Sequence, residues 1–78
     1  MGFVITVQND GVDATVDVNE QINLNQSIQV FSGFIGGGTS VQVACQGSPP
    51  KDFSWTHHGS GLSGGPDTVG DGGILRVS

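Results

Sequence analysis

The chain has 78 residues and a formal net charge of −5, because seven acidic residues stand against only Lys51 and Arg76. Two cations cannot form the positive surface that a phosphate backbone requires, so we expect no nucleic-acid partner. The apolar runs are too short for a transmembrane helix, and the segment Phe3-Val4-Ile5 is too short and uncharged for a secretory signal peptide. We therefore expect no membrane partner either.

The single cysteine, Cys45, excludes a disulfide within the chain. Together with the lack of an export signal, it predicts folding in a reducing cytoplasm. Ten valines against three leucines favour strands over helices. A chain this short buries only about 60% of its unfolded surface, so we expect self-association to supply further apolar burial.

Strict alternation of apolar and polar residues marks the first two segments. Phe3, Ile5 and Val7 alternate in the first, and Val12–Val18 alternates in the second. Such alternation is typical of strands with one buried face. Asp10-Gly11 between the two segments is a hairpin signal. We predict an N-terminal hairpin within residues 1–19, which either packs on its own chain or acts as an exchanged arm.

The stretch Ser27–Trp55 is predicted to be the centre of the fold. A third strand is expected over Ile22–Phe31, where Gln26 interrupts the alternation and indicates a bulge or a change of sheet. A fourth strand over Val41–Cys45 is expected to follow a flexible hairpin connection at Gly36–Gly38. These two strands should supply much of the core.

A proline-containing loop at residues 47–52 should precede a fifth strand over Phe53–His57. The stretch Gly59–Gly73 contains seven glycines and one proline, which predicts a long loop that is either disordered or functional. A short last strand is expected over Ile74–Val77. The sequence thus predicts a single all-β domain over residues 1–78, a small antiparallel β-sandwich or partly open barrel of about six strands.

Two groups of apolar residues have different expected roles. We expect one group to anchor the core: Trp55, Phe53, Val41, Val43 and Cys45. An alternative for Trp55 is stacking on a sugar ring, since aromatic rings offer an apolar face with a polar edge. The second group lies beside the glycine run and outside the regular alternation, and we place it at an oligomer interface: Phe31, Phe34 and Ile35.

Polar residues offer three candidate chemistries, and the sequence favours a structural alternative to each. Cys45 with His57 or His58 could form a nucleophile and its base, but Cys45 continues a buried strand face. The two histidines are neighbours on a strand, so their rings point to opposite faces and cannot readily chelate one ion.

The third candidate is a calcium site among the acidic residues. Candidate ligands lie in two stretches: Asp10, Asp13, Asp17 and Glu20, and then Asp67 and Asp71. Neither stretch has the ligand spacing of a calcium-binding loop, so solvated strand faces are the better interpretation. We expect no catalytic, cofactor or metal site, and we therefore expect that the protein is not an enzyme.

The segment Gly36–Gly47, followed by Trp55 and by Leu75-Arg76-Val77, resembles the small valine- and glycine-rich β-sandwich proteins of bacteriophage virions. The resemblance covers about half of the chain. It implies a capsid decoration, cement or tail-associated protein, a homo-oligomer, with a trimer favoured, that contacts other virion proteins. The alternative is a carbohydrate- or protein-binding β-sandwich module whose site is formed by the 59–73 loop and exposed aromatic residues.

Overall fold

The computed structural model describes residues 2–78, so Met1 lies outside the described part of the chain. The fold is all-β, as predicted, but it has seven strands rather than six. The strands are β1 Phe3–Asn9, β2 Ala14–Asn23, β3 Gln26–Ile35, β4 Ser40–Cys45, β5 Lys51–His57, β6 Leu62–Val69 and β7 Ile74–Val77. No helix capable of crossing a membrane occurs within these residues.

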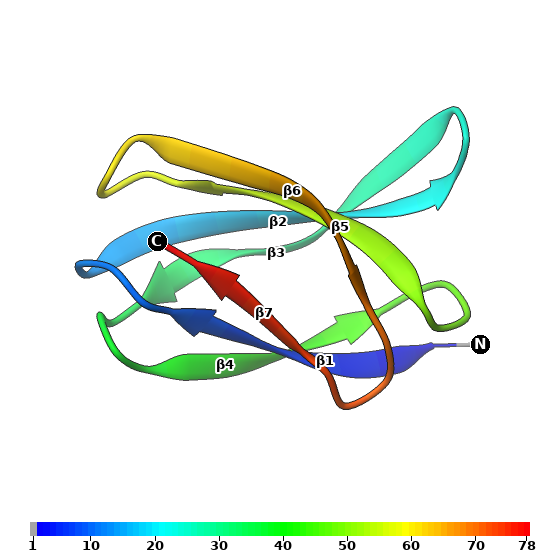
Figure 1. Ribbon diagram of the computed structural model, residues 1–78, viewed down its shortest axis with the longest axis horizontal. Helices are drawn as coiled ribbons and strands as arrows, with labels where there is room; N and C mark the ends of the chain where they lie inside the picture. Colours follow the sequence, from blue (N-terminus) through cyan, green and yellow to red (C-terminus); the bar gives the residue numbers. More distant parts are fainter. Residues whose placement is uncertain (1) are drawn as a thin grey trace.

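The strands form two sheets that pack face to face (Figure 1). The smaller sheet has the order β4-β1-β7, in which β1 is antiparallel to β4 and parallel to β7. The larger sheet has the order β3-β2-β5-β6 and is antiparallel throughout. Because the two sheets remain separate, the architecture is a sandwich and not a barrel.

The predicted N-terminal hairpin is wrong, because β1 and β2 lie in different sheets. The connection through Asp10 and Gly11 carries the chain across the core from one layer to the other (Figure 1). The connection at Gly36–Gly38 does the same between β3 and β4, so it is not a hairpin either. Alternation identifies the buried face of a strand, but a strand can bury that face in either layer.

The predicted third strand is also wrong, because it spans a turn. β2 continues to Asn23, the chain turns at Leu24, and β3 begins at Gln26. This β2–β3 hairpin projects from the body, and Leu24 at its tip is 97% exposed. A register shift beyond Val18 leaves Val30 as an extra residue on β3, so the buried phase passes to Phe31 and Ile35.

Much of the predicted 59–73 loop is the strand β6, which pairs with β5. The residues of β6 do not alternate between apolar and polar, because β6 is an edge strand whose residues are mostly exposed, with Val69 its one buried side chain. Trp55 of β5 lies opposite Gly64. A Cβ atom at Gly64 would lie 2.5 Å from the Trp55 ring, so the indole packs directly on this glycine.

The core between the sheets contains three of the predicted anchors as buried side chains, Phe53, Val43 and Cys45. The other two, Trp55 and Val41, are partly buried and pack against this core. Phe3 meets Phe53 edge to face across the sheets, with ring centroids 6.2 Å apart.

Glu20 is a fully buried carboxylate that joins the two layers. It belongs to β2, but its Oε1 and Oε2 accept hydrogen bonds from the backbone N–H groups of Gln46 (2.7 Å) and Gly47 (2.8 Å), just after β4. Both oxygens therefore have a charge-assisted partner, which offsets the cost of burial. Glu20 fixes the β4–β5 loop to the larger sheet.

We predict that Glu20→Gln lowers the free energy of unfolding by about 1–3 kcal/mol, the usual cost of leaving a buried donor unpaired. The amide NH₂ of glutamine would face one of the two backbone N–H donors, so one hydrogen bond becomes a clash of donors. Urea unfolding monitored by circular dichroism measures the loss. Asp67→Asn is the matched control, because it removes a negative charge from an exposed position on β6. Equal stability of the two variants would contradict the assigned role of Glu20.

Candidate functional site

Three loops and the C-terminal residue meet at one end of the sandwich, which we call the loop end. It consists of residues 10–13, 36–39 and 58–61 together with Ser78 (Figure 1, left). Backbone hydrogen bonds connect these segments: Gly38 N–H donates to Asn9 O (2.7 Å), and Asp10 N–H donates to Val77 O (2.7 Å). The Asp13 carboxylate accepts the Gly37 N–H at 2.7 Å. The loops thus brace one another.

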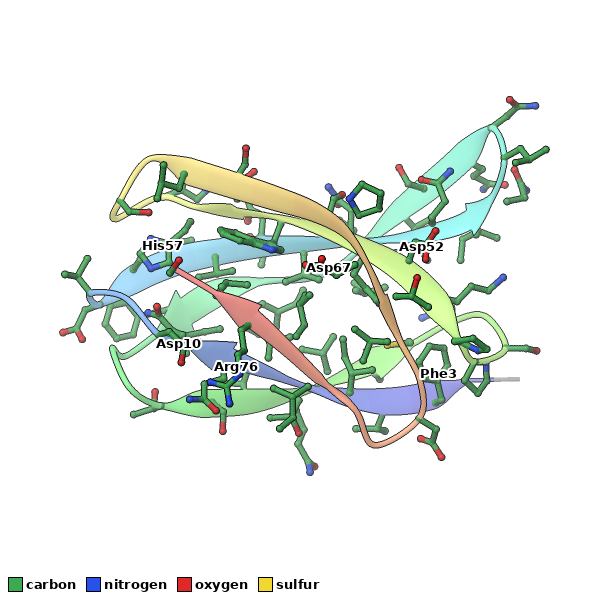
Figure 2. All side chains as sticks on the ribbon, viewed as in Figure 1. Phe3, Asp10, Asp52, His57, Asp67 and Arg76 are labelled. Carbon is green, nitrogen blue, oxygen red and sulfur yellow. The ribbon has the colours of Figure 1, made fainter. Side chains whose placement is uncertain are left out.

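A buried pair of side chains, Asn9 and His57, lies beneath the loop end. Figure 2 shows His57 at this end of the sandwich. The Asn9 amide nitrogen donates to Val12 O (2.7 Å) and Ile35 O (2.8 Å), and its Oδ1 lies 2.9 Å from His57 Nε2. His57 Nδ1 accepts the Ser60 backbone N–H at 2.9 Å. Since Nδ1 accepts, the ring hydrogen is on Nε2 and is donated to Asn9. Every polar atom of the pair is hydrogen-bonded.

The Ser60 hydroxyl lies 3.0 Å from His57 Nδ1, so a serine, a histidine and an asparagine occur in a row. The order resembles a nucleophile with its base, but the ring nitrogen that a base would use already accepts the Ser60 backbone N–H. The hydroxyl has a further partner in Ser78 O at 2.9 Å. This arrangement stabilises the β5–β6 turn.

The outer face of the larger sheet carries a polar group next to the loop end. Asp17 on β2 accepts a hydrogen bond from Ser32 on β3 at 2.6 Å, and its second oxygen lies 2.7 Å from His58 Nε2. The Ser32 hydrogen bond, followed by the hydrogen bond and charge of His58, lowers the pKa of Asp17 below its ordinary value. The group therefore presents an ionised carboxylate, held in place, and a half-exposed imidazole.

Three large apolar side chains are exposed at the loop end: Val12, Phe34 and Leu62, which are 62%, 66% and 58% exposed. Leu62 lies opposite the buried His57, so it points to the other face of the larger sheet from Asp17. Phe34 lies opposite Thr15, two residues along β3 from Ser32, and so shares the outer face with Asp17. We call Val12, Phe34 and Leu62 the apolar rim.

The predicted interface residues separate in the structure. Phe34 projects into solvent, whereas Ile35 is 1% exposed and belongs to the core, so its placement at an interface is wrong. Phe31 is partly buried against the core, with its ring over Gly33. After the bulge at Val30, alternation resumes and continues to Ile35, which puts the neighbours Phe34 and Ile35 on opposite faces.

Cys45 forms no hydrogen bond with either histidine among the described residues, and it is buried, as the alternation of β4 predicts. Its thiol donates to Val43 O at 3.7 Å. Burial, and secondarily the Glu20 charge, raises the pKa of Cys45 to about 11. A thiol with so high a pKa is a poor nucleophile near neutral pH.

The acidic residues that we considered for calcium are dispersed. Asp10 pairs with Arg76 at 3.2 Å, Asp71 accepts the Val4 N–H at 3.3 Å, and Glu20 is buried at the opposite end from Asp13. Within residues 2–78, no three His, Cys, Asp or Glu side chains lie close enough to hold a metal ion.

An open groove of about 600 Å³ lies at the opposite end, beneath the projecting β2–β3 hairpin. It is lined by residues of this hairpin and of the start of β5: Gln21, Ile22, Asn23, Leu24, Pro50, Lys51 and Asp52. Lys51 Nζ donates to Ile22 O at 3.1 Å and so braces the base of the hairpin.

Comparison of the chain with protein-family models, curated proteins and solved structures gives no match. The sequence analysis missed the Asp17, Ser32 and His58 group and the Asn9–His57 pair. The outward phase of β2 did place Asp17 in solvent, but only the strand order β3-β2-β5 shows that Ser32 and His58 lie on either side of it.

We predict that the Asp17 carboxyl titrates below its ordinary value of 3.8 in the folded protein. Because its folded pKa lies below the unfolded one, the Asp17 contacts stabilise the fold above the unfolded value, and this contribution is lost as pH falls through the folded value. Carbon-detected NMR titration of the carboxyl group gives the midpoint. Ser32→Ala should raise it more than His58→Gln, since Ser32 is the larger cause. An Asp17 midpoint at or above 3.8 would contradict the geometry.

Proposed function

We propose that this protein is a non-catalytic structural component of a virion that associates with itself and with other virion proteins on the particle surface. The observation that carries the proposal is the apolar rim, three large apolar side chains exposed at one end of a small acidic domain. Exposed apolar surface is typical of protein-protein contact sites. The hydrogen-bonded loops beneath them provide a rigid base.

A structural role is supported by how the polar groups are used. His57 and Asn9 bind each other and the backbone, Glu20 binds two amides, and Cys45 is a buried thiol. These groups hold loops and sheets together, and a catalytic site would need them to converge on a reacting atom. The virion assignment rests on the resemblance of the 36–47 segment to small bacteriophage β-sandwiches. A closed ring, and a trimer in particular, is the assembly we favour.

We predict that the protein forms an oligomer whose mass in solution depends on Phe34. Phe34→Asp should weaken the association at least about tenfold, because loss of one buried aromatic contact costs about 1.5–3 kcal/mol. Sedimentation equilibrium over a range of concentrations measures the change. Leu24→Asp is the control, since Leu24 is also an exposed apolar residue but lies at the tip of the β2–β3 hairpin, away from the loop end.

A parent protein that stays monomeric at millimolar concentration would contradict self-association. A folded Phe34→Asp variant with unchanged mass would show that the apolar rim is not the contact. A double variant, Phe34→Asp with Ile35→Asp, is unsuitable as a test, because Ile35 is a core residue and its replacement by a charge would unfold the domain.

The second candidate function is carbohydrate binding, and the position of Phe34 beside Asp17 favours it. An exposed ring can stack on the apolar face of a sugar, while a carboxylate held ionised by Ser32 and His58 accepts hydrogen bonds from sugar hydroxyls. Glycan-array binding that is lost in both Phe34→Ala and Asp17→Asn, with oligomeric mass unchanged, would establish this function. Binding that survives either change would reject this site.

A further inference from the structure

The free edge of β4 presents unpaired backbone groups. In the smaller sheet, Thr6 N–H donates to Gly73 O (2.9 Å), and Val4 O accepts from Gly72 N–H (2.8 Å). The even-numbered residues of β1 therefore direct their backbone N–H and C=O groups towards β7. The odd-numbered residues direct their backbone groups towards β4, as the hydrogen bond from Asn9 N–H to Thr39 O at 2.9 Å shows. Backbone groups of an antiparallel strand alternate between its two sides.

This alternation determines which residues of β4 are free. Val41, Val43 and Cys45 lie opposite Val7, Ile5 and Phe3, and direct their N–H and C=O groups to β1. The residues between them therefore direct their N–H and C=O groups to the open edge: Ser40, Gln42 and Ala44. All three are exposed.

The other edge strands carry features that discourage pairing with a further strand. β6 contains Pro66, which lacks an N–H, and has a register shift where it pairs with β5. β7 has only four residues, one of them Arg76. β3 is interrupted by two register shifts along its pairing with β2. β4 has an unbroken register and contains no charged residue, glycine or proline.

We propose that β4 pairs antiparallel with β4 of a second copy about a two-fold axis at Gln42. In this register Gln42 lies opposite Gln42 of the second copy, and Ser40 lies opposite Ala44. The free groups of both strands are then paired by roughly six main-chain hydrogen bonds. The two three-stranded sheets become one continuous sheet with the order β7-β1-β4-β4-β1-β7.

Two further properties of β4 fit a second copy as the occupant. The register keeps Val41 opposite Val43 of the second copy, so core-facing side chains of both sandwiches stay on the same side, and the half-buried Val41 gains cover. The seven acidic residues of each copy lie outside β4, so the pairing brings no two carboxylates on this strand together. An uncharged edge suits a copy of itself in a chain of net charge −5.

This contact goes beyond the proposed function and does not depend on it, because it uses the edge of the smaller sheet and not the apolar rim. A chain with both surfaces binds one neighbouring copy through the β4 edge and other copies through the apolar rim. The assembly can then extend in two directions.

Disulfide trapping tests the register. Gln42→Cys in a Cys45→Ala background should give a cross-linked dimer under mild oxidation, because residues of a hydrogen-bonded pair have Cα atoms about 5.5 Å apart, within disulfide range. Thr6→Cys in the same background is the control. Thr6 pairs with Gln42 in the same sheet but lies one strand further from the contact. The Thr6 Cα atoms of the two chains would therefore be about 14 Å apart, which is three strand spacings. We expect cross-linking at least about tenfold faster for Gln42→Cys; equal rates would overturn the proposal.

Hydrogen exchange tests the contact without any substitution. The amides of Ser40, Gln42 and Ala44 should gain protection as protein concentration rises, whereas exchange that does not depend on concentration would overturn the proposal. Repeating both measurements on Phe34→Asp separates the two contacts. Retained cross-linking in that variant shows that the β4 contact stands when the apolar rim is disrupted, and its loss would show that the two are one interface.

Discussion

The hydrogen bond between Asn9 and His57 is the interaction on which the loop end depends. One residue ends β1 in the smaller sheet and the other ends β5 in the larger, so the bond closes the sandwich where four chain segments meet. Asn9 also holds the carbonyls of Val12 and Ile35. In a buried site each of these groups would be costly to leave unpaired, so the pair specifies one arrangement of the loops.

Glu20 performs the same task at the other end, where it binds the amides that follow β4. The core between these two polar anchors is built mainly from valine, isoleucine and phenylalanine, which fill space but do not determine how the loops are placed. Apolar packing favours the sandwich as a whole, and the two anchors select its connections. Phe34 and Leu62 lie at the strand ends that adjoin the loops held in this way.

Sequence patterns predicted the strands that bury one face, since β1, β4, β5 and β7 all lie where alternation placed them. The same patterns do not assign strands to layers, so Asp10-Gly11 predicts a hairpin where the chain in fact crosses between the sheets. β6 escaped prediction because an exposed edge strand has no buried face to produce alternation. The bulge at Val30 reversed the phase of β3, which is why Ile35 was expected at the surface. The Asp17 group depended on strand order, which no local pattern contains.

The packing of Trp55 on Gly64 makes the single tryptophan a native optical probe. Its indole lies between the core and β6, and its Nε1 is buried with no hydrogen-bond partner among the described residues. If β6 detaches from β5, water reaches this nitrogen before the core opens. Tryptophan emission therefore reports fraying of this strand, while far-ultraviolet circular dichroism reports loss of both sheets. The midpoints of these two signals would coincide only if the strand and the sandwich unfold together.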